Sequence, residues 1–187
     1  PLAHRRYGPE RPPEVVLLHG LSASAAFWEP VAGALARRGL SVLVPDLLGF
    51  GGSRRIGTAF GLHEQVEAVA RLVEASGSRH ALVAGHSFGC AVAVGLADSH
   101  PEQVRALTLV APPAFADPER ARRRLERRGW LARQVLKGAP TASAVCNAMC
   151  LTRTAIGAIA VRMAPHVPEP VARESVQHTW PAYRAAL

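Results

Sequence analysis

The most informative part of this sequence is His80-Ala81-Leu82-Val83-Ala84-Gly85-His86-Ser87-Phe88-Gly89. Its first half is a short apolar run that stops at Gly85, as a buried strand does. The residues from Phe88 to Ala97 are small and apolar, which predicts a helix packed against a sheet. The pattern Gly-x-Ser-x-Gly between them predicts a sharp turn from strand to helix with Ser87 at its tip. Glycine suits both flanking positions because a side chain at Gly85 or Gly89 would collide with the tight turn.

Three more short apolar runs surround this stretch, at Glu14 to Leu18, Ser41 to Val44 and Val104 to Val110. They are apolar on both faces and bounded by turn residues, which is typical of buried parallel strands. Helical patterns lie between them, at Phe27 to Arg38 and at Leu62 to Glu74. This alternation predicts an α/β fold, with a mostly parallel sheet and helices on both faces.

The character of the sequence changes after about residue 114, where no further strand-like run occurs. Asp117-Pro118 predicts the start of a helix, because Asp caps helices and Pro fits their first position. Arg120 to Val135 then predicts a very basic helix. Three further helical stretches follow, at about 141–150, 153–163 and 169–178. We therefore divide the chain into a core, residues 1–113, and a helical part, residues 114–187.

The composition excludes several classes of protein. The chain has 187 residues, of which 49% are hydrophobic and 19% charged, so it is not disordered. We expect no membrane span, because no apolar run approaches ~18 residues, and no secretory signal, because the N-terminus has no apolar core. Three cysteines without a C-x-x-C pair argue against a disulfide framework and favour the cytoplasm. The missing initial Met indicates a processed, trimmed or partial chain.

The net charge of +8 raises nucleic-acid binding as a possibility. Nearly all of the basic residues are Arg, with Lys137 the one lysine, and such a bias reflects a genome rich in G and C as readily as a phosphate-binding surface. We therefore predict no nucleic-acid partner. The Arg-rich stretch 120–133 is interpreted as a solvated face; an anionic substrate, an acyl carrier or a membrane surface remain open alternatives.

A second motif, His19-Gly20-Leu21, directly follows the first strand-like run. A backbone N–H just after that strand can reach the serine, and the residue after the serine offers a second donor. Leu21 and Phe88 are thus the candidates for an oxyanion hole. His19 is interpreted as structural, with hydrogen bonds inside its own loop, rather than as a catalytic base.

The third motif runs from Pro45-Asp46 through a glycine-rich turn to Ser53. Its spacing fits neither G-x-G-x-x-G nor a phosphate-binding loop with Lys, so no nucleotide site is predicted. We expect Asp46 to accept hydrogen bonds from backbone amides of that loop. Four aromatic residues could line a substrate pocket or belong to the ordinary core: Phe27, Trp28, Trp130 and Trp180.

Taken together and in this order, the three motifs resemble the α/β-hydrolase superfamily over roughly residues 2–113. The resemblance implies that the helical part is the lid of these enzymes, that Ser87 is the catalytic nucleophile, and that Leu21 and Phe88 are the oxyanion donors. Lidded members mostly cleave esters, and some cleave carbon–carbon bonds, amides or lactones, without a cofactor. We accordingly expect no cofactor, no metal and a small, apolar acyl substrate. Serine at position 87 argues against epoxide and carbon–halogen hydrolases, whose nucleophile is Asp.

The acid and histidine of this family follow the lid, in the order Ser, Asp/Glu, His. Asp98 and His100 lie at the far end of a helix ~15 Å long, out of reach of Ser87. His166 and His178 fall in the helical part, where a solvated or packed histidine is expected. We therefore expect the acid and base to lie beyond residue 187, and the C-terminal strands, the first strand and part of the second to be missing.

Three functions are compatible with these observations. The first is a serine hydrolase that cleaves an ester or related carbonyl substrate through an acyl-enzyme at Ser87. The second is a truncated, non-catalytic protein of the same fold, and the third is a carbon–carbon bond hydrolase of the same superfamily. The substrate itself is not predicted, because the packing of the lid shapes the pocket, and neither is the oligomeric state.

Overall fold

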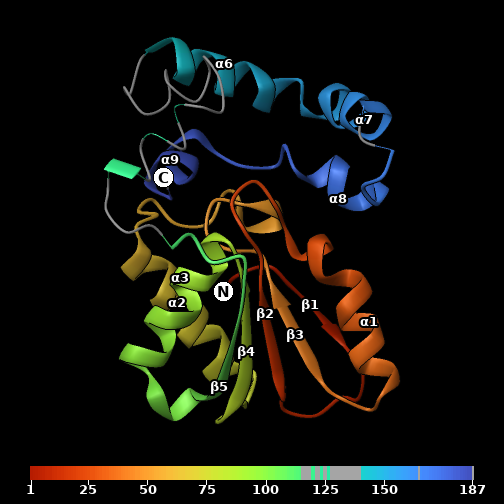
Figure 1. The fold of residues 1–187 in the computed structure, drawn as a ribbon, viewed down its shortest axis with the longest axis vertical. Helices are drawn as coiled ribbons and strands as arrows, with labels where there is room; N and C mark the ends of the chain where they lie inside the picture. The colour runs from red at the N-terminus through yellow and green to blue at the C-terminus, as the bar shows by residue number, and fades with distance from the viewer. Residues whose placement is uncertain (115–118, 121–122, 124–125, 127–139, 164, 187) are drawn as a thin grey trace.

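The computed structural model describes the whole chain except residues 115–118, 121–122, 124–125, 127–139, 164 and 187 (Figure 1). One five-stranded sheet runs through the described residues in the order β1-β3-β2-β4-β5. The strands are β1 (His4–Tyr7), β2 (Val15–Leu18), β3 (Val42–Pro45), β4 (Ala81–His86) and β5 (Val104–Val110). Strands β2 to β5 are parallel to one another, and β1 is antiparallel to β3. The α/β fold with a mostly parallel sheet is therefore confirmed.

The four strand-like runs of the sequence correspond to β2, β3, β4 and β5. A fifth strand, β1, precedes them and pairs with β3, and it has no counterpart among the apolar runs of the sequence. Strand β1 has the polar sequence His4-Arg5-Arg6-Tyr7, and its residues alternate between exposed and half-buried. An edge strand of this kind carries no apolar pattern, since most of its side chains meet water.

Helices cover both faces of the sheet, as the alternating pattern predicted (Figure 1). Helix α1 (Glu29–Arg37) lies on one face, and α2 (Leu62–Ala75) and α3 (Phe88–Ser99) lie on the other. Alternate residues of β2 point to opposite faces of the sheet. Val16 and Leu18 pack in the core with α2 and α3, and Val15 and Leu17 pack in the core with α1. The run 15–18 is apolar throughout because both of its faces are buried. Short 3-10 helices complete this part: η1 (Ala25–Trp28), η2 (Gly51–Ser53) and η3 (Pro101–Gln103).

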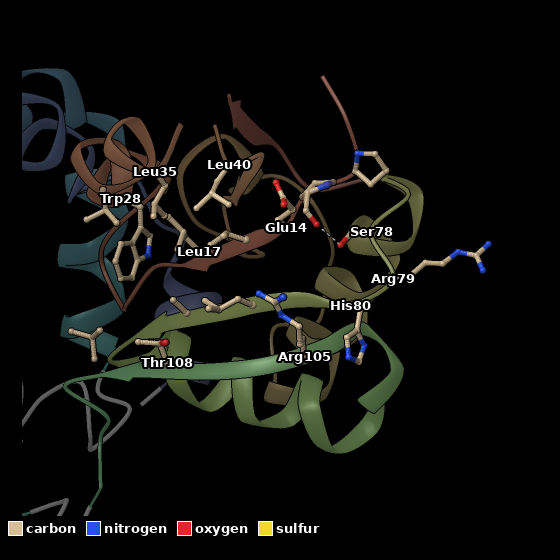
Figure 2. Close-up of a pocket in the computed structure, with 17 residues that line it drawn as sticks. Glu14, Leu17, Trp28, Leu35, Leu40, Ser78, Arg79, His80, Arg105 and Thr108 are labelled. Carbon is tan, nitrogen blue, oxygen red and sulfur yellow. Dashed lines mark hydrogen bonds between the residues drawn. The ribbon is translucent and has the colours of Figure 1, made fainter. Parts of the chain in front are cut away.

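The sheet is less well covered at β5, which is its edge in the described part of the chain. Leu107, Leu109 and Val110 are 38%, 42% and 41% exposed. On the α1 side, a groove of about 480 Å³ runs between α1 and β5, and its lining includes Leu17, Leu35 and Thr108 (Figure 2). Helix α1 thus shields the β2–β3 half of this face and leaves the β4–β5 half accessible.

The C-terminal helices are α6 (Pro140–Leu151), α7 (Arg153–Met163), α8 (Glu169–Glu174) and α9 (Trp180–Ala185). Helices α8 and α9 lie between the core and the outer pair, α6 and α7 (Figure 1). The predicted helices at 141–150 and 153–163 are confirmed by α6 and α7. The start of a helix at Asp117-Pro118 and the basic helix 120–135 fall largely outside the described residues. No helix in the part of the chain that the structure describes has the length and apolar character needed to cross a membrane.

The predicted helix 169–178 is shorter than expected, because the chain turns extended after α8 to pair with the loop that follows β3. Phe50 and His178 form an antiparallel β-bridge. Beside it, the Gly51 N–H donates to the Gln177 carbonyl at 2.8 Å, and the Thr179 N–H donates to the Gly49 carbonyl at 3.0 Å. This pairing requires an extended backbone, so the helix cannot continue through it. The next helix, α9, buries Ala182 completely in the core.

Candidate active site

Ser87 lies on the turn between β4 and α3, where the sequence predicted it. Its φ of 51° falls in the left-handed region, which non-glycine residues rarely adopt and which costs about 1–3 kcal/mol. The turn is held from both sides: the Ser87 N–H donates to the Val110 carbonyl at 3.0 Å, and the Cys90 N–H donates to the Ser87 carbonyl at 2.9 Å. The surrounding structure therefore maintains a strained serine, which is half-buried.

The two glycines of the motif are required by close backbone contacts. A Cβ added to Gly85 would lie 2.3 Å from the Gly89 carbonyl oxygen. A Cβ added to Gly89 would lie 2.4 Å from the Leu18 carbonyl oxygen, on the neighbouring strand β2. Both distances are far below van der Waals contact, and the atoms concerned belong to backbone that cannot rotate away. The steric reason predicted for the Gly-x-Ser-x-Gly spacing is confirmed.

The loop after β2 runs directly beside this turn. A Cβ added to Gly20 would lie 3.1 Å from the Cβ of Ser87 and 2.8 Å from the Nδ1 of His86. Leu21 follows Gly20 in this loop, and Phe88 follows Ser87 in the turn. Neither amide donates a hydrogen bond within the part of the chain that the structure describes. The structure thus brings the turn and the loop together, as the two motifs predicted, with two N–H groups available for an acceptor.

His19 is completely buried beneath this loop. The Leu47 N–H donates to its Nε2 at 3.0 Å, so the proton of the neutral ring is on Nδ1, which donates to the Gly20 carbonyl at 2.8 Å. Burial lowers the pKa of His19 and keeps the ring neutral. Since both nitrogens are engaged, His19 joins the loop after β2 to the loop after β3, and its predicted structural role is confirmed.

Asp46 joins the same two loops. Its Oδ1 accepts the Ala25 N–H at 2.6 Å, and its Oδ2 accepts the Gly52 N–H at 2.9 Å. Gly51 packs against the carboxylate, since a Cβ added there would lie 2.5 Å from the Asp46 Cγ. The prediction that Asp46 binds backbone amides of its own loop is confirmed, and the bond to Ala25 extends this role to the loop beside Ser87.

An aromatic contact flanks the serine. The rings of Phe27 and His86 stack with centroids 4.4 Å apart and an interplanar angle of 25°, and Trp28 meets Phe27 edge-on at 5.2 Å. Burial lowers the pKa of His86. The sequence left two interpretations open for the aromatic residues, a substrate pocket or ordinary core. Trp28 is 6% exposed and belongs to the core. Phe27 is half-buried next to His86. Trp130 lies outside the described residues. The partnership of Phe27 with His86 had no signal in the sequence.

The thiol of Cys90 lies just beneath the turn. Its Sγ donates to the Gly85 carbonyl at 3.0 Å and to the Val110 carbonyl at 3.4 Å. Burial raises the pKa of this thiol, so it stays protonated at neutral pH. Because the thiolate is the nucleophilic form, the protonated Cys90 is a poor nucleophile.

The remaining acidic and histidine candidates are not brought to Ser87. Asp98 is exposed at the far end of α3, and the Nε2 of His100 pairs with Glu67 at 2.9 Å. His166 is exposed, and the ring of His178 packs 5.0 Å from that of Tyr183. Within the described part of the chain, the Ser87 hydroxyl has no hydrogen-bonding partner.

We expect the buried histidines to make stability fall between pH 7 and pH 5. Burial lowers the pKa of His19, His86 and His178, so below pH 6.5 the unfolded chain binds more protons than the folded one. Stability therefore falls as the pH falls; His19 alone contributes a slope of up to about 1.4 kcal/mol per pH unit. Urea unfolding midpoints at pH 5 and 7 measure this effect. His19→Gln should reduce the slope, and equal midpoints for the unmodified chain would contradict the prediction.

Comparison with known proteins identifies the family. A family model described as alpha/beta hydrolase fold matches residues 13–145. Lipase LipV of Mycobacterium tuberculosis (strain ATCC 25618 / H37Rv) is 37% identical over 118 residues, which cover 63% of this chain and 44% of the lipase. The putative carbamate hydrolase RutD of Azorhizobium caulinodans is 38% identical over 103 residues, which cover 55% of this chain and 38% of that protein.

A solved structure extends the likeness in fold. The enol-lactonase from Burkholderia xenovorans LB400 superposes with a TM-score of 0.68 at 22% identity, over 99% of this chain and 67% of the lactonase. The matched segment spans less than half the length of each of the two curated relatives. The family model, in contrast, matches well over half of this chain, strands β2 to β5 and the Ser87 turn included. The chain therefore belongs to the α/β-hydrolase fold family.

Proposed function

We propose that Ser87 is the nucleophile of a serine hydrolase that cleaves an ester or a related carbonyl substrate through an acyl-enzyme. The observation that carries this proposal is the strained Ser87, at φ 51° on the β4–α3 turn, with the amides of Leu21 and Phe88 beside it. Strain of this kind is retained where function requires it. The names of the curated relatives, a lipase and a putative carbamate hydrolase, fit this class of reaction.

In the proposed reaction, the Ser87 oxygen attacks the carbonyl carbon and gives its proton to a base. A C–O bond forms while the π electron pair of the carbonyl moves onto its oxygen. Donation from the amides of Leu21 and Phe88 stabilises that oxyanion, and each such donor is worth about 3 kcal/mol in enzymes where one has been removed. The N-terminus of α3 adds positive partial charge at the same place. The tetrahedral intermediate then collapses: its C–O bond to the leaving group breaks, and the leaving oxygen takes the proton from the base and departs as an alcohol. Water next attacks the acyl carbon and gives a proton to the base, which passes it to the Ser87 oxygen as the acyl–serine bond breaks and the acid is released.

We further propose that the C-terminal helices act as a lid over this site. Helix α8 contacts η1, and α9 packs on Gly49, so both sit on loops that follow strands β2 and β3. The carboxyl ends of parallel strands share one edge of a sheet, and Ser87 follows β4 at that edge. Phe27, half-buried beside His86, supplies an apolar wall there, which favours a small-molecule substrate with an apolar acyl group.

The test is a fluorophosphonate, which reacts with activated serines and leaves a stable adduct. Added to the natural gene product, it is expected to modify Ser87, because this serine alone combines the strained turn with the two proposed oxyanion donors. Mass spectrometry of the peptide that contains Ser87 locates the adduct. Modification at a different residue, with Ser87 left intact, would overturn the proposal.

A further inference from the structure

The loop between β2 and η1, residues 19–24, carries one proposed oxyanion donor and holds a strained residue. Ser22 has a φ of 56°, in the left-handed region that serine rarely adopts. A backbone of this kind persists only where surrounding contacts over-determine it. The position of the Leu21 amide, one residue earlier, therefore depends on what fixes the loop at its two ends.

The first end and part of the second are fixed by the core. His19 is held by its bonds to Leu47 and Gly20, and Asp46 accepts the Ala25 N–H. These contacts come from β2 and from the loop after β3, so they are present whether or not the C-terminal helices are docked. None of these contacts involves the Ser24 hydroxyl. Because Ser24 is only 2% exposed, its hydroxyl needs a hydrogen-bonding partner from another part of the chain.

That partner is Glu174, the last residue of α8. The Ser24 hydroxyl accepts the Ala26 N–H at 3.2 Å, as the N-cap of η1, and donates its own proton to the Glu174 carboxylate. The bonds form a chain, from amide to hydroxyl to carboxylate, in which each bond polarises the next. A single residue from the C-terminal helices thus completes the cap of the short helix that ends the loop.

Glu174 is itself held in place by a cation. The Arg5 guanidinium, on β1, pairs with Glu174 at 2.8 Å and extends to Glu29 at 3.5 Å. The Glu174 side chain is 22% exposed, so the charge is largely removed from water and needs this partner. Arg5 therefore orients the carboxylate toward Ser24 rather than leaving it to solvent.

We propose that Glu174 is a positioning residue that sets the place of the Leu21 amide through Ser24, and so couples docking of α8 to oxyanion stabilisation. The inference rests on the proposed function for its effect on catalysis. The structural half of the inference, the ordering of residues 22–28 by Glu174, does not depend on the role of Ser87. The two can therefore be tested separately.

The experiment compares Glu174→Gln with Glu169→Gln in the natural gene product. Glu169 is a matched control, because it lies on the same helix and its side chain is 61% exposed. It pairs with Arg173 rather than with Ser24 or Arg5. Hydrogen exchange of the peptide covering residues 22–28 reports on the bonded amides of Ala25, Ala26 and Phe27. Glu174→Gln is expected to speed their exchange roughly tenfold or more, the loss expected for a hydrogen bond to a charged group. Exchange in α3 should not change.

The kinetics of ester hydrolysis distinguish a positioning role from a purely structural one, because a purely structural role would not lower kcat selectively. Glu174→Gln is expected to lower kcat roughly tenfold with KM within about twofold, because an oxyanion contact acts in the transition state. Ser24→Ala, which removes the partner on the loop, should reproduce both effects even if Glu174→Gln fails to fold. Unchanged exchange over 22–28, or a rise in KM at constant kcat, would overturn the inference. Faster exchange together with hydrolysis that survives Ser87→Ala would overturn the proposed function instead and leave the ordering role intact.

Discussion

Ser87→Ala in the natural gene product is expected to lower the rate of ester hydrolysis by about 10⁴- to 10⁶-fold. The substitution removes the proposed nucleophile while the amides of Leu21 and Phe88 and the Phe27 wall remain, so substrate binding should persist. The free energy of unfolding should change by less than about 1 kcal/mol, since the Ser87 hydroxyl has no hydrogen-bonding partner in the described part of the chain. Initial rates on a p-nitrophenyl ester and a urea unfolding curve measure the two quantities.

A matched control for this experiment is Ser99→Ala. It removes the same atom at the other end of α3, where the side chain is exposed. Turnover of this variant should equal that of the unmodified enzyme. Hydrolysis at an unchanged rate after Ser87→Ala would remove the main support for the serine mechanism and leave the chain with the family fold but a different nucleophile or none.

Gly89→Ala is expected to destabilise the protein by about 3 kcal/mol, although alanine is the better helix former. The added Cβ would lie 2.4 Å from the Leu18 carbonyl oxygen and 2.6 Å from that of His19. Both atoms belong to backbone at the end of β2, so α3 and the sheet must separate to admit the methyl group. For a chain of this size the melting temperature should fall by about 6–12 °C.

Gly33→Ala makes the same chemical change in the middle of α1 and should have the opposite sign. The nearest atom to the added Cβ is Arg37 Nη1 at 3.6 Å, which is ordinary contact. Here the gain in helix propensity, about 0.5–1 kcal/mol, is not offset by a clash. Thermal melts of the two variants against the unmodified chain give the comparison. A Gly89→Ala variant as stable as Gly33→Ala would mean that the backbone contact between α3 and β2 is looser than described.

The parts of the fold that could be predicted are those with a local signal. The run 81–84 is apolar because both faces of β4 are buried, and the glycines beside Ser87 are there because no other side chain fits. The structural roles of His19 and Asp46 followed from their place just after a strand, where loop amides need acceptors. Each of these predictions depends on residues a few positions apart, and each is confirmed.

The parts that could not be predicted depend on partners distant in sequence. Strand β1 is polar and owes its conformation to pairing with β3, and α8 ends early because residues 177–179 pair with the loop after β3. The Ser24–Glu174 contact joins positions 150 residues apart, and neither residue stands in a periodic pattern. Periodicity reports which face of an element is buried, but it carries no information about which distant side chain arrives there.

The distance in sequence between Arg5 and Glu174 has a consequence in time. The two residues are 169 positions apart, so a ribosome that adds 5–20 residues per second makes the second about 10–30 s after the first. Strands β2 to β5 are made during that interval, before α8, and until Glu174 is made Ser24 lacks this carboxylate partner. We therefore expect the loop beside Ser87 to be among the last parts of the protein to become ordered.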